Sequence, residues 1–378
     1  MSEHVPVGGR LITKPFTILI LLAMLAFAIL VARFLFGLGS VTAMSDGYPW
    51  GIWIVIDVMI GTAFGCAGYS VALLVYVMNK GEYHPLVRPA VMAGLFGYTL
   101  GGIAVMIDLG RYWQFWTLLW PGYVNLNSVM LEVAWCVMAY IVVLWIEFTP
   151  AFLERLGMKN LKQKLSKLLF LFIAVGVLLP TMHQSSLGTL ATAVGFKISP
   201  LWQTQMVPLL FLLSAVVMGY AIVPFESILS ALGLKRPFET KLLGKLSAAM
   251  LVVLIAYLVV RVIDLTWRGA WGYAFELNTQ AIMFWVEMAL FVAPVLMLMS
   301  PKNIYNPRLQ FLSGFSLLLA GSVYRINTYI IGYDAGPGWS YFPSAGEIMV
   351  TVGVFSFEVI LYLFFVKKLP VLHRAEAH

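Results

Sequence analysis

Several ionisable residues in the first half of the chain stand near the ends of long apolar runs. Asp57 and Glu132 come early in two of these runs, whereas Asp108 and His183 come at the ends of two others. If the runs are helices that cross a membrane, a rise of about 1.5 Å per residue puts all four side chains at a similar depth near the outer face. Tyr98 then lies nearer the middle of the membrane. Carboxyl and imidazole groups can pass protons to a bound redox group, so this pattern predicts a polar pocket. For any one acid, the alternative is a hydrogen bond to a neighbouring helix.

The second half of the chain has a different set of charges. Arg261 and Asp264 are three residues apart, which puts them on one helical face. Glu287 and Arg325 complete a set of two acids and two bases, and this balance suggests mutual neutralisation. We expect a structural ion-pair cluster, with a transport site as the alternative. Two further acids, Glu226 and Glu358, lie nearer the inner side of the membrane. They are interpreted as neutral hydrogen-bonded carboxyls, with a role in a proton path as the alternative.

The histidines and cysteines argue against bound metal centres. A di-haem cytochrome b needs histidines facing each other at one depth, and of the 5 histidines only His183 falls at an outer membrane level. Histidine–methionine ligation stays open but has no supporting motif. Cys66 and Cys136 are too few for an iron–sulfur cluster, which takes about four thiolates. These counts therefore argue against a di-haem cytochrome b and an iron–sulfur cluster, and no metal site is predicted.

The apolar runs dominate the composition. Of 378 residues, 61% are hydrophobic and 11% are charged, and the mean hydropathy is +0.90. Soluble domains are about half apolar and a quarter charged, so a soluble enzyme or nucleic-acid-binding domain is excluded. An all-α polytopic membrane protein is predicted, because a spanning helix needs about 20 apolar residues. The ten candidate spans are 16–36, 51–78, 90–108, 128–149, 166–182, 203–229, 242–265, 278–300, 309–331 and 346–366.

Basic residues indicate the orientation. The chain has 24 Lys and Arg and a net charge of +7, and most of these cations fall in alternate connecting segments. Cytoplasmic loops carry such an excess, so both termini are predicted to be cytoplasmic. The opposite loops are rich in aromatic residues, which is typical of a membrane interface or of a surface covered by another protein. These outside loops are 46–51, 111–123, 183–188, 267–278 and 333–343, and none is long enough to be a soluble catalytic domain.

Several short strings together resemble one protein family. Alone, GYTLGG (97–102) indicates only close small-residue packing between helices. In combination, the strings are similar to the integral membrane subunit of Hyb-type (hydrogenase-2) nickel–iron hydrogenases, within the NrfD-like superfamily of polysulfide-reductase and nitrite-reductase membrane subunits. They are FGLGSV (36–41), YPWGIWI (48–54), YHPLVRPA (83–90), FGYTLGG (96–102), DLGRYW (108–113), NLNSVMLE (125–132), LPTMHQSS (179–186) and PLWQ (200–203).

The resemblance implies an architecture and a set of partners. A first four-helix bundle, 51–186, would hold a quinone site, and a second bundle would cover 200–331. Helices 16–36 and 346–366 would flank them within a single membrane domain, 1–378. The implied partners are a periplasmic four-cluster iron–sulfur subunit, a nickel–iron large subunit and a small subunit, which dock on the periplasmic face of the bacterial inner membrane.

The resemblance implies that the chain binds no haem. It also carries over site residues, all within the matching strings except Asp57, which follows YPWGIWI by three residues. The expected catalytic residues bond the quinone oxygens and relay protons, and they are His183, Glu132, Asp57 and Tyr98. The expected cofactor-binding residues are Trp50, Trp53, Asp108, Arg111 and Gln184. A proton route from the inside would begin at Tyr98, Glu132 and Glu147.

The resulting functional prediction is the quinone-reactive membrane subunit of a respiratory nickel–iron hydrogenase. Electrons from periplasmic H2 oxidation would reach menaquinone or ubiquinone in this chain, with proton translocation as a further expectation. The chain would be part of a hydrogen:quinone oxidoreductase but would contain no hydrogenase active site. The alternatives are the same scaffold in polysulfide, tetrathionate or nitrite reduction, a secondary transporter, and a passive membrane anchor.

Overall fold

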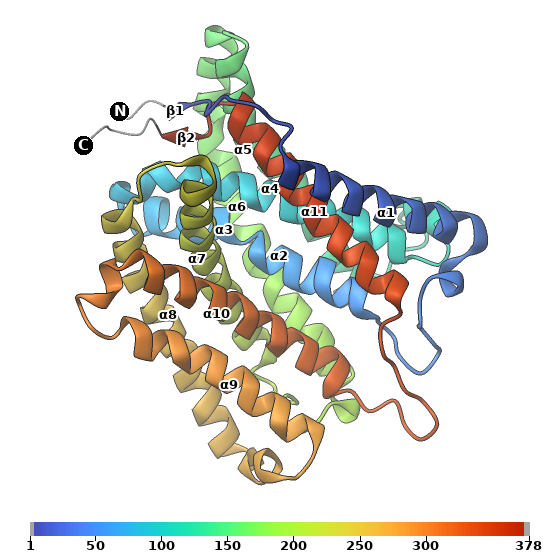
Figure 1. The fold of residues 1–378 in the computed structure, drawn as a ribbon. Coiled ribbons are helices and arrows are strands. Elements are labelled where there is room, and N and C mark those ends of the chain that lie inside the picture. The colour runs from blue at the N-terminus through green and yellow to red at the C-terminus, as the bar shows by residue number, and fades with distance from the viewer. Residues whose placement is uncertain (1–3, 374–378) are drawn as a thin grey trace.

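The computed structural model describes residues 4–373, which form an almost entirely helical protein (Figure 1). Within this range, 10 helices are long and apolar enough to cross a membrane. This confirms the predicted all-α polytopic class, and the chain is an integral membrane protein. The long helices are α1 Lys14–Phe36, the composite span Ile54–Val77, α4 His84–Asp108, α5 Val129–Arg155, α6 Lys159–Ala193, α7 Val207–Leu234, α8 Thr240–Trp267, α9 Thr279–Leu298, α10 Pro307–Ile326 and α11 Ala345–Lys368. Shorter 3-10 helices lie at Leu38–Ser40, Gly81–Tyr83, Tyr112–Leu119, Gly195–Lys197, Ala270–Phe275 and Asn303–Tyr305.

The second span is not a regular helix. Wide π turns at Ile54–Ile60 and Leu73–Val77 enclose the short helices α2 (Gly61–Phe64) and α3 (Ala67–Ala72). A third stretch of π turns, Asn327–Ile331, extends α10. Such turns frequently occur at functional sites, and the first of them carries Asp57.

Glycines of α4 allow the second span to approach closely. A Cβ atom on Gly97 would lie 3.0 Å from the Gly61 carbonyl oxygen, and one on Gly101 would lie 2.9 Å from the Asp57 carbonyl oxygen. Both separations are too short for a side chain to be added without movement. This confirms the small-residue packing predicted for 97–102.

The fifth span is longer than predicted. The sequence placed its end at residue 182 and an outside loop at 183–188, but α6 continues as a regular helix to Ala193. The loop prediction is wrong because this segment stays buried against α7: a Cβ on Gly188 would lie 2.6 Å from Pro208 Cα. His183 therefore lies within the helix rather than after it.

The helices pack in sequence-adjacent groups. α7, α8, α9 and α10 contact one another, α3 to α6 form a second set of contacts, and α1 lies along α11. α7 also packs against α3 and α6, so the two groups share one buried core. The exact division into bundles at 51–186 and 200–331 stays a prediction.

Both ends of the described chain lie on one side of the molecule. Strand β1 (His4–Val5) pairs antiparallel with strand β2 (Leu372–His373), as Figure 1 shows. An even number of spans requires this arrangement. We call this side the termini side; Arg374, which contributed to the predicted orientation, lies outside the described residues.

Candidate functional site

His183 is buried between α6, α2 and α4, with 1% of its surface exposed. Its Nε2 lies 3.1 Å from Thr62 Oγ1, and its ring meets the Tyr98 ring edge-on at 5.7 Å between centroids. Its Nδ1 is buried without a hydrogen-bond partner among the described residues. A buried polar atom that lacks a partner costs about 1–3 kcal/mol, so this nitrogen is suited to a ligand.

The hydrogen bonds around Thr62 define what His183 can do. The Thr62 hydroxyl donates its one proton to the Val58 carbonyl, so it accepts from its other neighbours. It accepts a hydrogen bond from Gln184 Nε2 at 3.1 Å and, by the same logic, from His183 Nε2. This assigns the proton of the neutral imidazole to Nε2 and leaves Nδ1 as an open proton acceptor.

Tyr98 and Gln184 complete this cluster. The Tyr98 side chain is fully buried, and its hydroxyl lies 3.7 Å from Cys66 Sγ. The structure therefore brings together three of the predicted site residues, His183, Gln184 and Tyr98. Thr62 was not predicted, although its place just after Asp57 in the second span was the available signal.

Arg325 joins this cluster from the second half of the chain. Its guanidinium is fully buried and donates to Gln184 Oε1 at 3.2 Å, to the Gly321 carbonyl at 3.1 Å and to Ser214 Oγ at 3.3 Å. Among residues 4–373 it forms no salt bridge. The prediction that it belongs to an ion-pair cluster is wrong, because the end of α10 directs it towards α6.

Asp57 and Asp108 form a second group near the outer end of α4. The two carboxyls are close enough to interact electrostatically, and Arg33 lies near Asp108. Arg33 is buried in α1 and donates from Nε to the Ile107 carbonyl at 2.6 Å, which places a cation at the end of α4 where the helix dipole favours it. Arg111, which the sequence placed in the same site as Asp108, is exposed and forms no salt bridge among the described residues, whereas Arg33 interacts electrostatically with Asp108.

The remaining predicted residues face other partners. Glu132 is exposed and accepts a hydrogen bond from Ser186 Oγ at 2.7 Å. Trp50 and Trp53 are buried, and their indole N–H groups donate to the Tyr329 and Glu347 carbonyls at 3.1 and 2.9 Å. The predicted site residues therefore lie in separate groups rather than in one pocket, and the group around His183 brings the most of them together.

A hydrogen-bonded junction at Glu347 fixes the start of α11. The Tyr341 hydroxyl donates to Glu347 Oε1 at 2.7 Å and accepts from the Ile52 backbone N–H at 2.7 Å. Burial raises the pKa of the Tyr341 phenol above its ordinary value, and the hydrogen bond to Glu347 raises it further. The hydroxyl therefore stays protonated, and it ties the loop before α11 to the start of the second span.

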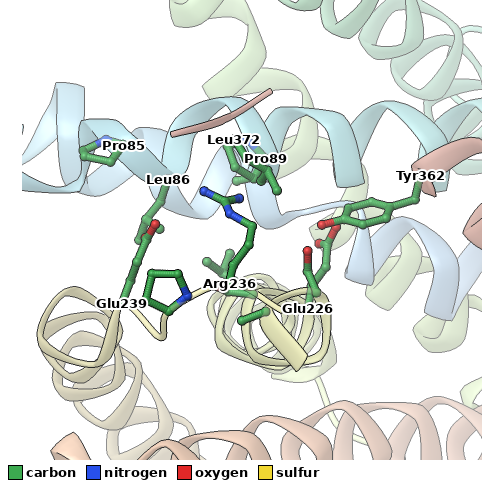
Figure 2. A pocket seen from close by; sticks show the side chains of 14 residues that line it. Pro85, Leu86, Pro89, Glu226, Arg236, Glu239, Tyr362 and Leu372 are labelled. Atoms are coloured by element: carbon green, nitrogen blue, oxygen red, sulfur yellow. The ribbon is translucent and has the colours of Figure 1, made fainter. Parts of the chain in front are cut away.

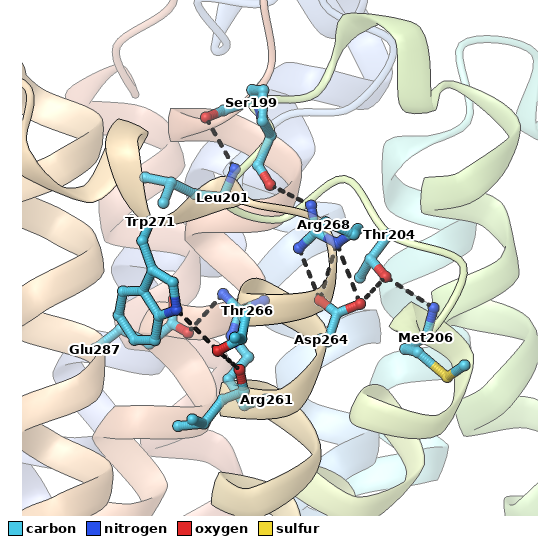
Figure 3. Close-up of polar contacts among 12 residues, drawn as sticks. Ser199, Leu201, Thr204, Met206, Arg261, Asp264, Thr266, Arg268, Trp271 and Glu287 are labelled. Atoms are coloured by element: carbon cyan, nitrogen blue, oxygen red, sulfur yellow. Dashed lines mark hydrogen bonds and ion pairs between the residues drawn. The ribbon is translucent and has the colours of Figure 1, made fainter.

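The other three charged residues of the second-half set, Arg261, Asp264 and Glu287, are each in an ion pair (Figure 3). Arg261 and Glu287 are both fully buried, with an N–O distance of 3.5 Å. Asp264 does not pair with Arg261; it forms an ion pair with Arg268 at 2.7 Å and accepts from Thr204. The expected structural cluster is thus observed for these residues, with Arg268 in place of Arg325.

Comparison with known proteins shows the family of this chain. Residues 40–330 match the family model described as polysulphide reductase, NrfD, and the chain belongs to this family. The match covers most of the chain and confirms the resemblance seen in the short motifs.

Individual relatives extend the comparison over the whole chain. The chain is 43% identical over 370 residues to the probable Ni/Fe-hydrogenase 2 b-type cytochrome subunit of Escherichia coli (strain K12), covering 97% of this chain and 94% of the relative. It is 27% identical over 378 residues to the integral membrane subunit of the menaquinone reductase of Nitratidesulfovibrio vulgaris (strain Hildenborough), covering 89% of this chain and 86% of the relative.

The name of the Escherichia coli relative corrects one prediction. A b-type cytochrome carries haem, so this name contradicts the prediction that the chain binds no haem. The histidine count was an insufficient argument because it excluded only paired histidines. Among residues 4–373, His183 is the one histidine buried in the membrane-spanning part, and the side chains around its ring present no second histidine. The residues at His183 therefore do not fit a bis-histidine haem, and no step below is derived through haem.

Proposed function

We propose that this chain is the quinone-reactive membrane subunit of a respiratory hydrogen:quinone oxidoreductase. In this role it accepts electrons from a periplasmic iron–sulfur subunit, which a nickel–iron large subunit and a small subunit supply from H2. The chain itself holds no hydrogenase active site. The names of the two relatives, a hydrogenase 2 subunit and a menaquinone reductase subunit, support both halves of this proposal.

The observation that carries the proposal is the open Nδ1 of His183. It is buried among helices, unpartnered within the described residues, and held by the bond from Nε2 to Thr62. Menaquinone or ubiquinone, when bound, takes up two electrons and two protons to become the quinol. Nδ1 suits this exchange, because it accepts a hydrogen bond from a hydroxyl and, when protonated, donates one to a carbonyl oxygen.

Arg325 and Gln184 provide the electrostatic setting of the site. The guanidinium contacts Gln184, the neighbour of His183 on α6, without an acid to neutralise it. A buried cation stabilises negative charge that develops nearby during reduction. Tyr98 excludes water from the other side of the imidazole ring.

The other predicted residues keep supporting roles in the proposal. Asp57 and Asp108 would exchange protons near the outer end of α4, and Glu132 with Ser186 lies on the α5–α6 side. Trp50 and Trp53 form apolar walls between the site and the neighbouring helices. Arg111 is exposed at the outer loop, where a partner would contact it.

The proposed orientation puts the termini side in the cytoplasm of a bacterial inner membrane. The opposite side then faces the periplasm and exposes apolar aromatic side chains in the segment Tyr112–Leu119 and just beyond it. Trp113, Trp116 and Trp120 are 59%, 48% and 60% exposed. We assign this surface to the docking of the iron–sulfur subunit.

The test is H2-dependent reduction of a short-chain quinone by the purified complex, compared between the wild type and His183→Ala. We expect at least about a hundredfold loss of quinone reduction, the lower range for removal of a general acid–base group. H2-dependent reduction of a soluble dye, which bypasses this subunit, should be unchanged. Unchanged quinone reduction in an assembled His183→Ala complex would reject the site and favour a passive anchor.

A further inference from the structure

A cavity of about 50 Å³ lies at the termini side, between α4, α7 and α11 (Figure 2). A water needs about 10–15 Å³ of such space, so the cavity has room for about three to five waters. Its wall includes the segment between α7 and α8, where Pro237 and Glu239 are exposed. Water on the termini side therefore reaches it.

Two titratable side chains meet at one end of this cavity. Figure 2 shows the Tyr362 hydroxyl of α11 directed at the Glu226 carboxyl of α7, and the two are hydrogen-bonded. Both side chains line the cavity, and both are mostly buried. A carboxyl and a phenol in this arrangement can exchange a proton with cavity water.

Glu358 extends this group towards the middle of the membrane. It precedes Tyr362 by one turn of α11, so the two lie on one helical face about 6 Å apart along the axis. Its carboxyl interacts electrostatically with Glu226 and with Asp57. Glu358 is therefore the acid of α11 that connects the cavity group with the acid at the π turn of the second span.

Arg236 lines the cavity beside Glu226, whereas the two deeper carboxyls of the series, Glu358 and Asp57, have no cation partner among the described residues. The buried acids of the second half differ, since Glu287 and Asp264 each have an arginine partner. Acids inside a membrane are costly and typically serve as proton relays when no structural partner explains them.

We propose that Glu226, Tyr362 and Glu358 form a proton-uptake route from the termini-side cavity to Asp57. The inference rests on the proposed function, which creates the demand for protons. Reduction of one quinone consumes two protons and two electrons, and the iron–sulfur partner supplies the electrons. Each carboxyl accepts a proton from the cavity side and releases one towards Asp57, so the route itself is unchanged after each transfer.

This route differs from the one predicted from the sequence. Glu132 is exposed near the opposite side, and Glu147 lies between α5 and α6, where its Oε1 would be 2.5 Å from a Cβ on Gly176. Among residues 4–373, neither acid forms a hydrogen bond or ion pair with Glu358 or Glu226. Uptake through α7 and α11 takes protons from the side opposite to H2 oxidation, so turnover would build a membrane potential.

The experiment uses the purified complex in liposomes, with H2 and a membrane-soluble quinone, and records quinone reduction and membrane potential together. Glu358→Gln and Glu226→Gln should each lower both signals at least about tenfold, because a neutral amide cannot carry the proton. Dye reduction by H2 should be unchanged. The matched control is Glu82→Gln, an exposed acid on the termini side that pairs with Lys245; it should behave like the wild type.

The outcomes separate this route from the proposed function. If the wild-type complex reduces dye but not quinone, the proposed function itself fails. If the wild type reduces quinone and both Gln variants match its rate and potential, the route is wrong. A loss in Glu147→Gln with normal Glu358→Gln would also overturn it. Should Glu358→Gln fail to assemble, Tyr362→Phe keeps the ring and should slow quinone reduction without affecting dye reduction; a wild-type rate there would reject the route.

Discussion

Two regions of this protein bury ionisable side chains, and they treat them differently. Between α8, α9 and α10, Arg261 faces Glu287, which also accepts hydrogen bonds from Trp202 at 2.8 Å and Asn327 at 2.9 Å. Around His183, by contrast, an imidazole nitrogen lacks a partner among the described residues, and the adjoining Arg325 lacks a carboxylate. Arg261 and Glu287 thus neutralise each other, although Arg261 Nε and Nη1 lack hydrogen-bond partners among the described residues, whereas Arg325 has no opposite charge there.

Inside a membrane protein, a structural charge can be distinguished from a functional one by the groups that surround it. Each region has a buried arginine, and each has buried polar atoms without a hydrogen-bond partner among the described residues, so neither feature separates the two regions. What separates them is whether each charge finds an opposite charge. An uncompensated buried group is expensive, and its retention indicates a use for it.

The largest expected effect comes from breaking the paired region. Arg261→Met should leave Glu287 buried without its cation, and removing one partner of a buried pair costs about 3–5 kcal/mol. We expect a large fall in the thermal unfolding temperature of the purified complex, or failure to assemble.

The control is the double variant Arg261→Met with Glu287→Leu, which removes both charges. It should recover much of the lost stability, because no unpaired charge is left. If the double variant is as unstable as Arg261→Met, the packing of Arg261 over Phe284 and Tyr324 matters more than the ion pair.

The next effect concerns the unpaired cation. Arg325→Met should lower H2-dependent quinone reduction about tenfold, through lost stabilisation of developing negative charge, while stability should change less than in Arg261→Met because no acid is left unpaired. Arg325→Lys, which keeps the charge, should recover part of the rate. The measurement is the ratio of quinone to dye reduction per assembled complex, and a ratio equal to that of the wild type in Arg325→Met would contradict the role.

The smallest effect is expected at the junction that holds α11. Tyr341→Phe removes the hydrogen bonds to Glu347 and to the Ile52 backbone, and a bond to a charged group contributes about 1.5–3 kcal/mol. The unfolding temperature should fall by a few degrees with little change across neutral pH, because the raised pKa of Tyr341 keeps the phenol protonated there. Tyr273→Phe, at a tyrosine that is 43% exposed, serves as the control and should be neutral.

The fold was largely predictable because membrane helices are specified by length and hydropathy. All ten predicted spans have a counterpart in the structure. The error at the end of α6 has a physical cause: residues 183–188 are polar enough to suggest a loop, yet they stay helical because α7 covers them. Hydropathy along the sequence does not show that one helix will be buried against another.

The site was less predictable, because depth in the membrane does not specify which way a side chain points. Asp57, Glu132 and His183 were assigned to one level, but Glu132 points to the outside of the bundle. Arg325 is distant in sequence from Gln184, so only the packing of α10 near α6 shows their contact. Thr62 is an ordinary residue in the sequence, and its role follows only from the hydrogen bonds that it makes.

The most direct test of the central claim is to locate the bound quinone. A short-chain quinone with a photoreactive tail would be crosslinked to the purified complex, and the labelled peptides of this chain would be identified with and without excess unlabelled quinone. We predict competed labelling in the second span, α4 and α6, around Thr62, Tyr98 and His183, and its loss in His183→Ala. Competed labelling confined to α8 and α9, or to another subunit, would contradict the assignment of the quinone site to the region around His183.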